Sequence, residues 1–453
     1  MEVHVNTINS TLVTDNPKLI RALVELYSFK VPGAEYSPQY KRHSWDGKKK
    51  FFSKKGQFKT GLLERVLEDL KKVEASPKIL DNRKIVIDHK DYDLEKFTYY
   101  DYQEKTIQKA LEKKRLVVKA PTGAGKTLII AGLVKALEGK KMVLLFNAKQ
   151  LLTQTYEFLD ALNIPNLGLC YSEGFILGDT MLCTVQSIEK ILDTHLDADV
   201  LMVDECHEFS NGKTTVAAIQ SFPNANYRYG FTATPPKQNI SKFNLEGGLG
   251  PVYAVATTKE LVDRGKLTKP IIQIIHRPYT AACQDDNLSY SEIYDQFIIN
   301  NSPRNNTIKD IINDIKNKNK RARILVLTKS LAHGRALEDL LGGSCEFLQG
   351  CDSIGERYEA ISRFRGCRES SILIGTKILQ TGINIEEITH FINARGMKSE
   401  IATLQALGRA LRRHESKEKV YIYDFFDQEK YLVDHSLERE KHYKAEGHEI
   451  KII

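Results

Sequence analysis

The chain has no long hydrophobic run. Its longest apolar stretches, such as residues 142–146 and 200–203, have the length of a strand, whereas a membrane span needs about 18 apolar residues. The start of the chain lacks a basic segment followed by an apolar one, which argues against a secretory signal. The 7 cysteines include no CxxC pair, which disfavours both a disulfide framework and a zinc site. We therefore expect a protein of a reducing compartment, the cytoplasm.

Several catalytic patterns are missing as well. Four histidines have no partners at metal-ligand spacing, namely His195, His207, His333 and His390. No Ser-His-Asp arrangement and no nuclease-like cluster of carboxylates stands out, and the chain has no internal repeat or low-complexity tract. These absences disfavour zinc enzymes, hydrolases with a serine or cysteine nucleophile, and nucleases.

The charge is mildly basic and unevenly spread. Across 453 residues, 66 basic and 58 acidic side chains give a formal net charge of +8, a weak indication of polyanionic partners. Between residues 41 and 59 a single acid, Asp46, stands among the basic residues Lys41, Arg42, Lys48, Lys49, Lys50, Lys54, Lys55 and Lys59. Aromatic residues are interleaved with them, namely Tyr40, Trp45, Phe51, Phe52 and Phe58. This pattern suits phosphate contact and base stacking, but it also suits a solvated basic surface around a small aromatic core in which Trp45 is structural.

The pattern of apolar residues predicts three domains. Residues 1–93 suggest a small α+β domain with a strand near the start, a helix opened by Asn16-Pro17, turns at Asp46-Gly47 and Lys55-Gly56, a helix over 62–73 and a short strand over 84–87. Residues 88–102 resemble a linker. Residues 94–265 and 266–453 then alternate β-branched runs with helical stretches, which is typical of parallel sheets covered by helices. The expected strands lie at 116–118, 142–146, 181–185, 200–203 and 227–231, and, after a break at 246–251, at 271–275, 324–327, 371–374, 389–392 and 420–423.

Residues 120–127 (APTGAGKT) are a candidate phosphate-binding loop. They follow an apolar strand and precede a helical run over 128–137, and Ala120 stands where the strict pattern has glycine. Glycines let backbone N–H groups surround a phosphate chain, and the helix N-terminus adds the positive end of its dipole. In this pattern Lys126 reaches the β- and γ-phosphates and Thr127 ligates Mg²⁺. The predicted nucleotide contacts are Pro121, Thr122, Gly123, Ala124, Gly125, Lys126 and Thr127.

A second candidate follows about 80 residues later. The apolar run 200–203 ends in Asp204 and Glu205, followed by Cys206 and His207. At the end of a buried strand, Asp204 can hold Mg²⁺ and Glu205 can orient and activate an attacking water. Alone, such a strand end is often merely structural; its place after the phosphate loop favours catalysis.

Together these motifs resemble a superfamily 2 helicase or translocase. The resemblance covers roughly residues 98–430 and rests on GAGKT, on DECH at 204–207, on the TAT of Thr232 to Thr234, and on QALGRALR at 405–412. It implies two RecA-like domains, ATP bound with Mg²⁺, coupling residues His207, Thr232 and Thr234, and a nucleotide-binding glutamine at Gln405. It also implies that Arg409 and Arg412, on one face of a helix, act as arginine fingers on the γ-phosphate.

Weaker motifs of the same family occur along the chain in the order that the family has them. Gln103 resembles the glutamine that reads adenine. The resemblance implies nucleic-acid contacts at Lys149, Gln186, Thr328, Lys329 and Thr376. Asn384 departs from the aspartate that usually ends its motif.

The N-terminal residues narrow the resemblance to the phage UvsW-type recombination helicases. The similarity is carried by residues 27–29 (YSF), 44–47 (SWDG) and 61–63 (GLL). That family implies 3′-to-5′ remodelling of branched DNA, including Holliday junctions, forks, D-loops and R-loops in recombination, repair and replication, and location in the host cytoplasm. It implies DNA as partner, RNA in RNA–DNA hybrids as a further one, and no obligatory protein partner. Two alternatives stay open: an RNA helicase, and an ATP-gated clamp that moves nothing.

Overall fold

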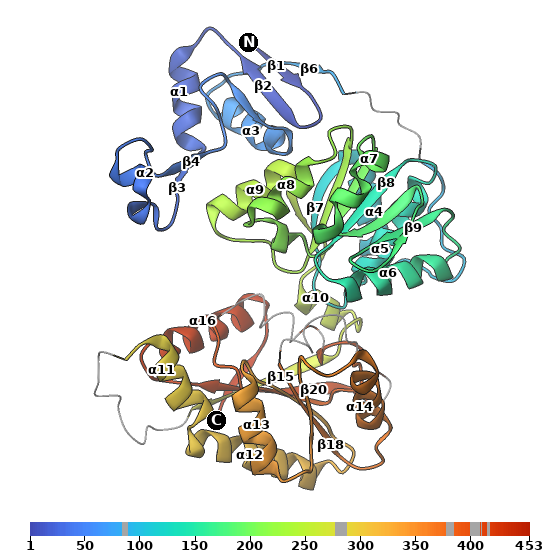
Figure 1. Cartoon of the computed structure of the whole chain (residues 1–453), viewed down its shortest axis with the longest axis vertical. Coiled ribbons are helices and arrows are strands. Elements are labelled where there is room, and N and C mark those ends of the chain that lie inside the picture. Colours follow the sequence, from blue (N-terminus) through green and yellow to red (C-terminus); the bar gives the residue numbers. More distant parts are fainter. Residues whose placement is uncertain (84–88, 277–287, 377–384, 399–407, 409, 415–416) are drawn as a thin grey trace. The chain divides into compact units, whose positions relative to one another are not determined.

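The computed structural model describes residues 1–83, 89–276, 288–376, 385–398, 408, 410–414 and 417–453 (Figure 1). The chain divides into two compact units. The first comprises residues 1–120 and 125–255, and the second comprises residues 256–453 with the short segment 121–124. The first unit holds a small N-terminal module (residues 1–82) and an α/β domain, so the predicted division into three domains stays a prediction.

The N-terminal module is the expected α+β structure. Its elements are β1 (Glu2–Val5), β2 (Asn9–Val13), α1 (Pro17–Leu26), β3 (Ser28–Lys30), α2 (Pro38–Lys41), β4 (Lys48–Lys50), β5 (Gln57–Lys59), α3 (Leu63–Lys72) and β6 (Lys78–Asp81). One sheet has the order β5-β2-β1-β6, and β3 pairs with β4. Asn16 caps α1 as the sequence suggests, because its side chain accepts from the N–H groups of Lys18 and Leu19.

Of the two expected hairpin turns, one is present and the other needs correction. Lys55-Gly56 does turn a tight hairpin, since Gly56 has φ +78° and Phe52 bridges Phe58. Asp46-Gly47, in contrast, ends the long loop between β3 and β4 and makes no tight hairpin. The strand expected at 84–87 lies outside the described residues.

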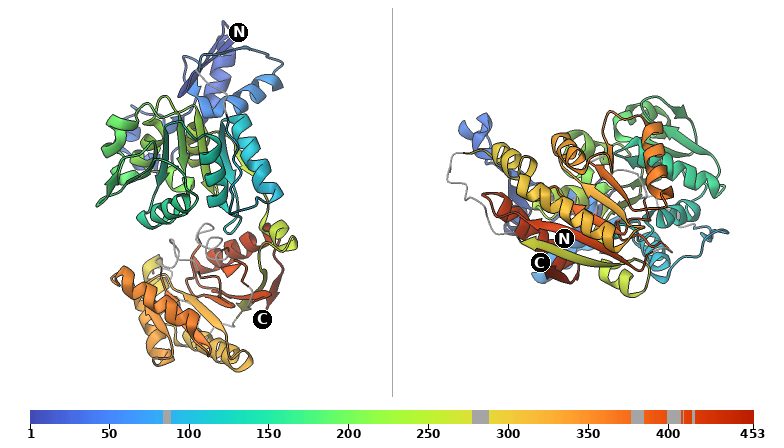
Figure 2. Two further views of the ribbon diagram at one scale, coloured as in Figure 1. Left: turned by 90° about the vertical axis from the view of Figure 1, so that its right-hand side faces the viewer. Right: turned by 90° about the horizontal axis from the view of Figure 1, so that it is seen from below.

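The first α/β domain has a mostly parallel sheet with helices on both faces (Figure 2). Its strands are β7 (Arg115–Lys119), β8 (Met142–Phe146), β9 (Leu167–Cys170), β10 (Phe175–Ile176), β11 (Thr180–Thr184), β12 (Val200–Val203), β13 (Tyr227–Thr232) and β14 (Val252–Ala254), in the order β10-β9-β11-β8-β12-β13-β7-β14. Its helices are α4 (Asp101–Lys113), α5 (Lys126–Ala136), α6 (Lys149–Ala161), α7 (Glu189–His195), α8 (Lys213–Gln220) and α9 (Asn239–Leu249). Every strand expected here is present, whereas β9, β10 and β14 were not foreseen. The expected break at 246–251 is wrong in part, because its first four residues extend α9.

The second unit repeats the architecture. Its strands are β15 (Lys269–His276), β16 (Arg323–Leu327), β17 (Glu346–Leu348), β18 (Ser371–Gly375), β19 (His390–Asn393), β20 (Lys419–Phe426) and β21 (Ile450–Ile452), all parallel in the order β17-β18-β16-β19-β20-β15-β21. Its helices include α10 (Thr258–Asp263), α11 (Tyr290–Tyr294), α12 (Ser302–Lys318), α13 (Leu331–Leu341), α14 (Ile354–Gly366) and α16 (Leu432–Ala445). The predicted fold class, two RecA-like α/β domains, is confirmed. In the part of the chain that the structure describes, no helix has the length and apolarity of a membrane span.

The N-terminal module packs on α9 of the first α/β domain. Phe243 of α9 lies 4.7 Å from Phe29, 5.3 Å from Phe51 and 5.6 Å from Tyr27, measured between ring centroids. The guanidinium of Arg65 lies over the Phe243 ring. The three phenylalanines of the basic stretch therefore belong to a core rather than to a stacking surface, since Phe52 and Phe58 are buried and stacked on each other and Phe51 packs against them.

A buried ion pair and a close backbone approach complete this contact. Arg65 Nη2 lies 2.8 Å from Oε2 of Glu246, a carboxylate almost fully buried. A Cβ at Gly61 would stand 2.0 Å from the Glu246 carbonyl oxygen, so only glycine permits this approach. The module and the first α/β domain are thus one packed body.

Replacing Phe243 by alanine should destabilise the first unit. The change empties a site among three aromatic rings, and we expect a loss of about 3 kcal/mol in the free energy of unfolding, measured by urea denaturation. Leu437→Ala, at a half-exposed position of α16, is the matched control and should change it by less than about 0.5 kcal/mol. A loss below about 1 kcal/mol for Phe243→Ala would contradict this packing role.

Acidification should destabilise the second unit through His333. Burial lowers the pKa of His333 to about 3, and its Nε2 donates to Oδ1 of Asn305 at 3.1 Å. The unfolded chain binds this proton near pH 6.5 and the folded chain only near pH 3, so stability is complete above pH 6.5 and falls by about 1 kcal/mol per pH unit between those values. Urea denaturation at pH 7, 6 and 5 should show a shallower loss for His333→Gln, which keeps the donor but does not titrate. Equal pH dependence in both proteins would refute this.

Candidate nucleotide-binding and catalytic site

The phosphate loop joins β7 to α5. Gly123 and Gly125 have φ of +87° and +77°, and the Ala124 N–H donates to the Pro121 carbonyl. Gly125 caps α5, and a Cβ there would stand 2.3 Å from Nε2 of Gln103. Glycine is therefore required at 125 both by the backbone and by the space.

Lys126 and Thr127 begin α5, at the positive end of its dipole. Lys126 Nζ lies 3.4 Å from the Ala120 carbonyl oxygen and 3.9 Å from Oε1 of Glu205. Thr127 is exposed. The loop thus offers an ammonium group, backbone N–H groups and a hydroxyl at one helix N-terminus, the donor set that a nucleotide phosphate chain needs.

Asp204 and Glu205 follow β12, as the sequence predicts. Asp204 is half-buried, and its Oδ1 is a buried atom that has no hydrogen-bond partner within the described residues. Burial and the neighbouring Glu205 carboxylate raise the pKa of Asp204, while Lys126 opposes this shift. Glu205 has φ +44°, in the left-handed region that residues with a Cβ rarely adopt, so the fold maintains a strained backbone here.

A divalent cation fits this arrangement. A buried carboxylate oxygen without a partner is costly, and a cation would compensate it. Asp204 and Thr127 supply the oxygen ligands that Mg²⁺ prefers. In the described residues, this site included, no group of three or more His, Cys, Asp or Glu side chains could hold a metal ion, so the protein would supply only a few of the Mg²⁺ ligands.

The three predicted coupling residues lie together. His207 Nδ1 is 3.0 Å from Oγ1 of Thr232, and the same oxygen accepts the Thr234 N–H at 3.1 Å. The Thr232 carbonyl accepts the Ala120 N–H at 3.0 Å, which ties the start of the phosphate loop to the same residue. Thr232 therefore joins the loop, the DECH segment and the TAT segment.

The charge of His207 strengthens this link. Burial lowers the pKa of His207, but hydrogen bonds and charge from Glu205 and Glu208 raise it more, to about 9. The protonated form is therefore favoured at neutral pH, with Nδ1 beside the Thr232 hydroxyl and Nε2 at 3.3 Å from Oε1 of Glu208 in an ion pair.

Gln103 lies next to the phosphate loop. It is buried at the N-terminus of α4, and its Oε1 accepts the Tyr100 N–H at 2.9 Å. Its amide nitrogen approaches Gly125. The structure thus assigns Gln103 a capping and loop-packing position, and its reading of adenine stays a prediction.

The predicted nucleic-acid residues of the two α/β domains differ in exposure. Lys149 Nζ lies 2.7 Å from Oε2 of Glu173 and over the Tyr171 ring, and Gln186 is exposed. Lys329 lies over the rings of Tyr290 and Tyr294. Thr328 and Thr376 are buried, and the Thr328 hydroxyl donates to the Ser330 carbonyl.

The basic stretch of the N-terminal module is largely paired within the protein. Lys48 Nζ lies 2.6 Å from Glu25, Lys50 Nζ lies 2.6 Å from Asp46, and Lys49 donates to Asn244 of α9. Trp45 Nε1 donates to the Lys48 carbonyl, a structural position for this half-buried ring. Lys41 and Arg42 are exposed at the end of α2.

The expected arginine-finger helix is only partly described. Gln405 and Arg409 lie outside the described residues. Arg412 is not on a helix, contrary to expectation: it forms an isolated bridge with Leu267, and the Thr268 hydroxyl donates to the Arg412 carbonyl. Burial lowers the pKa of Arg412, and Glu386 opposes this. The chain leaves its helix before Arg412 because Leu411 and Arg412 pair with the segment that precedes β15.

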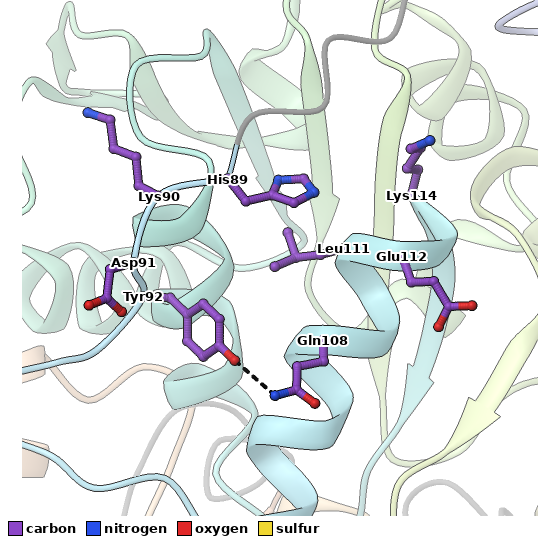
Figure 3. Close-up of a pocket in the computed structure, with 8 residues that line it drawn as sticks. All are labelled: His89, Lys90, Asp91, Tyr92, Gln108, Leu111, Glu112 and Lys114. Carbon is purple, nitrogen blue, oxygen red and sulfur yellow. Dashed lines mark hydrogen bonds between the residues drawn. The ribbon is translucent and has the colours of Figure 1, made fainter.

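A cavity of about 610 Å³ lies between residues 89–92 and α4 (Figure 3). Gln108 of α4 donates to the Tyr92 hydroxyl across it. The Lys90 N–H donates to the Ala136 carbonyl, so this part of the expected linker packs on the first α/β domain. None of the predicted site residues lines the cavity.

Sequence reasoning missed the contact between Phe243 and the module and the edge strand β10. Phe243 carries no local signal, because its partners lie about 200 residues away along the chain. The run Phe175-Ile176-Leu177 was visible but too short to identify as a strand.

Comparisons with known proteins agree with these motifs. Residues 96–237 match the family model described as "Type III restriction enzyme, res subunit", and residues 303–414 match the "Helicase conserved C-terminal domain". The ATP-dependent DNA helicase uvsW of Enterobacteria phage T4 is 23% identical over 94% of this chain and 90% of its own length. Putative helicase 22 of a Sulfolobus islandicus filamentous virus is 25% identical over 74% of this chain and 65% of its own length. A solved fragment of a putative HsdR subunit of a type I restriction enzyme from Vibrio vulnificus has the same fold, with a TM-score of 0.58 at 20% identity over 80% of this chain and 72% of the fragment.

Both family models match in order along the chain, and the phosphate loop and the Asp204–Glu205 pair lie at the ends of two strands in one sheet. The chain belongs to the superfamily 2 helicases and is an ATP-dependent helicase.

Proposed function

We propose that this helicase is a DNA motor that unwinds and branch-migrates branched DNA, including Holliday junctions, forks, D-loops and R-loops, in recombination, repair and replication. The likeness to the phage T4 DNA helicase extends over 94% of the chain and includes the N-terminal module. The basic module, packed on the first α/β domain, supports a grip on duplex or junction DNA beside the motor.

The hydrogen bonds centred on Thr232 carry the proposal. They connect the phosphate loop through Ala120 with His207 and with the Thr232–Thr234 segment. A motor must pass the state of the nucleotide to the segment that leads toward α9, and these hydrogen bonds supply such a path. An ATP-gated clamp needs the same signal, so the disassembly assay below separates the motor from the clamp.

Each residue of the site has a proposed task. Lys126 and the loop N–H groups bind the phosphates, and Glu205 orients the attacking water and takes its proton. Asp204 and Thr127 would hold Mg²⁺, which neutralises phosphate charge when bound. Arg409 and Arg412 would supply positive charge to the γ-phosphate in the closed state, as the family resemblance implies.

ATP hydrolysis measured with a panel of nucleic acids tests the proposal. A synthetic four-way junction should stimulate hydrolysis and be disassembled in an ATP-dependent manner, more strongly than single-stranded DNA or an RNA duplex. Selective stimulation by RNA would favour an RNA helicase. Stimulation of ATP hydrolysis without any disassembly of the junction would favour the ATP-gated clamp.

Lys126→Ala is the control for this panel. Loss of the ammonium group removes the main charge that the protein offers to the β- and γ-phosphates, so we expect hydrolysis to fall at least about 100-fold while junction affinity stays within about twofold. Junction affinity is measured by fluorescence anisotropy. Hydrolysis at the wild-type rate would refute the assignment of the loop.

Neutralising the basic surface of the module should weaken junction binding. Lys48, Lys49 and Lys50 contribute less than their charge indicates, because each already has a partner within the protein. The exposed Lys41→Gln/Arg42→Gln double variant is the sharper test, and it should reduce the slope of log affinity against log salt by about one to two units.

The matched control for this prediction is Lys320→Gln/Arg321→Gln, which removes the same two charges from an exposed loop of the second unit. An equal change of slope in both double variants would show a general effect of net charge and contradict a contact at Lys41 and Arg42.

A further inference from the structure

Three consecutive apolar side chains are exposed at one edge of the first α/β sheet. Phe175, Ile176 and Leu177 have exposed fractions of 50%, 50% and 58%. They belong to a hairpin formed by β9, a turn at residues 171–174 and β10, which we call the edge hairpin (residues 167–177). Single exposed apolar residues are ordinary, but a contiguous group indicates an interaction surface.

The edge hairpin is held firmly. The Tyr171 N–H donates to the Gly174 carbonyl at 2.9 Å, and Phe175 pairs opposite Cys170. A Cβ at Gly174 would stand 2.6 Å from the Tyr171 ring, so the ring lies over the turn. Lys190 Nζ donates to two carbonyls of the turn, at 3.3 and 3.1 Å. An ordered turn presents its exposed side chains at little entropic cost.

The sheet register places this turn beside the predicted nucleic-acid residues. β9, β11 and β8 run parallel, with Cys170 level with Cys183 and Thr184 level with Phe146. Their carboxyl ends therefore meet at one edge. Lys149 follows β8 at this edge, and Gln186 follows β11.

Contacts confirm that Lys149 reaches the edge hairpin. Its Nζ lies 4.4 Å from the centroid of the Tyr171 ring and 2.7 Å from Oε2 of Glu173. The Glu173 side chain is 75% exposed, and ion pairs so open to water contribute little to stability. A phosphate oxygen could therefore take the place of Glu173 at low cost.

We propose that the edge hairpin binds an unpaired nucleic-acid strand, with Phe175 and Tyr171 stacking on bases while Lys149 exchanges Glu173 for a backbone phosphate. Aromatic faces next to lysines are the combination that binds single strands irrespective of sequence. The inference rests on the proposed function and adds to it a strand contact, with Glu173 as a carboxylate that competes for Lys149.

Phe175→Ala in the full chain tests the stacking. Affinity for a fluorescent oligothymidylate should fall about fivefold or more, as for the loss of one stacked base. Phe175→Tyr keeps the ring and should retain the affinity. Leu437→Ala, with an equal exposed fraction of 50% in the second unit, should leave it unchanged.

Glu173→Gln tests the exchange at Lys149. Affinity should rise about two- to fivefold because Lys149 is released. Glu157→Gln removes the same charge from an exposed position of α6 and should have a smaller effect. In a Lys149→Met background Glu173→Gln should no longer raise the affinity, since its effect depends on that lysine.

The outcomes separate this inference from the proposed function. If wild-type protein hydrolyses ATP without stimulation by any nucleic acid, the proposed function fails. If stimulation is present but Phe175→Ala binds oligothymidylate as tightly as wild type, the inference fails. If the same variant abolishes a concentration-dependent dimer seen by light scattering and leaves strand affinity unchanged, the surface joins two copies of the chain and the inference is overturned.

Discussion

The hydrogen bonds of Thr232 are the constraint on which the rest of the site depends. β13 lies between β12 and β7 in the sheet, so its end is adjacent both to the DECH segment and to the phosphate loop. One buried residue can therefore accept the Ala120 N–H through its carbonyl, and meet His207 and the Thr234 N–H through its hydroxyl. The Glu205 and Glu208 carboxylates raise the pKa of His207, so the charge at Glu205 influences the imidazole that contacts Thr232.

Comparing one carboxylate from each unit distinguishes a structural carboxylate from a functional one. Asp424 in the second unit is buried, and Arg439 at 3.1 Å and the Tyr443 hydroxyl at 2.7 Å satisfy it. These contacts hold β20 and α16 together, and they satisfy the Asp424 carboxylate without a ligand. Asp204, in contrast, has a charged neighbour of the same sign, and its Oδ1 has no partner among the described residues. A buried carboxylate oxygen without a partner destabilises the fold, so its presence indicates a functional site. A cation, alone or bound to a phosphate, would compensate this carboxylate.

Local patterns predicted most of the fold, and long-range contacts decided the rest. Buried parallel strands such as β8 and β12 are continuous apolar runs, and the glycines of the phosphate loop signal its conformation, so both were visible in the sequence. Short edge strands such as β10 carry too few residues for a pattern. The aromatics of the basic stretch suited base stacking as well as a core, and only Phe243, far away along the chain, decides for the core. Arg412 was expected on a helix because the family motif that it matches lies on one, but Arg412 instead forms an isolated bridge with Leu267.

The contact at α9 also changes how the basic module should be understood. Lys49 donates to Asn244 at 2.8 Å, Asn244 donates to the Ser210 carbonyl at 2.8 Å, and the Ser210 hydroxyl donates to the His207 carbonyl at 2.6 Å. A continuous series of hydrogen bonds thus runs from the basic stretch to the DECH segment. α9 itself begins five residues after Thr234. Since Phe243 and Glu246 fix the module to that helix, the module cannot tilt without disturbing the segment that carries His207. The basic module and the DECH segment therefore belong to one packed body.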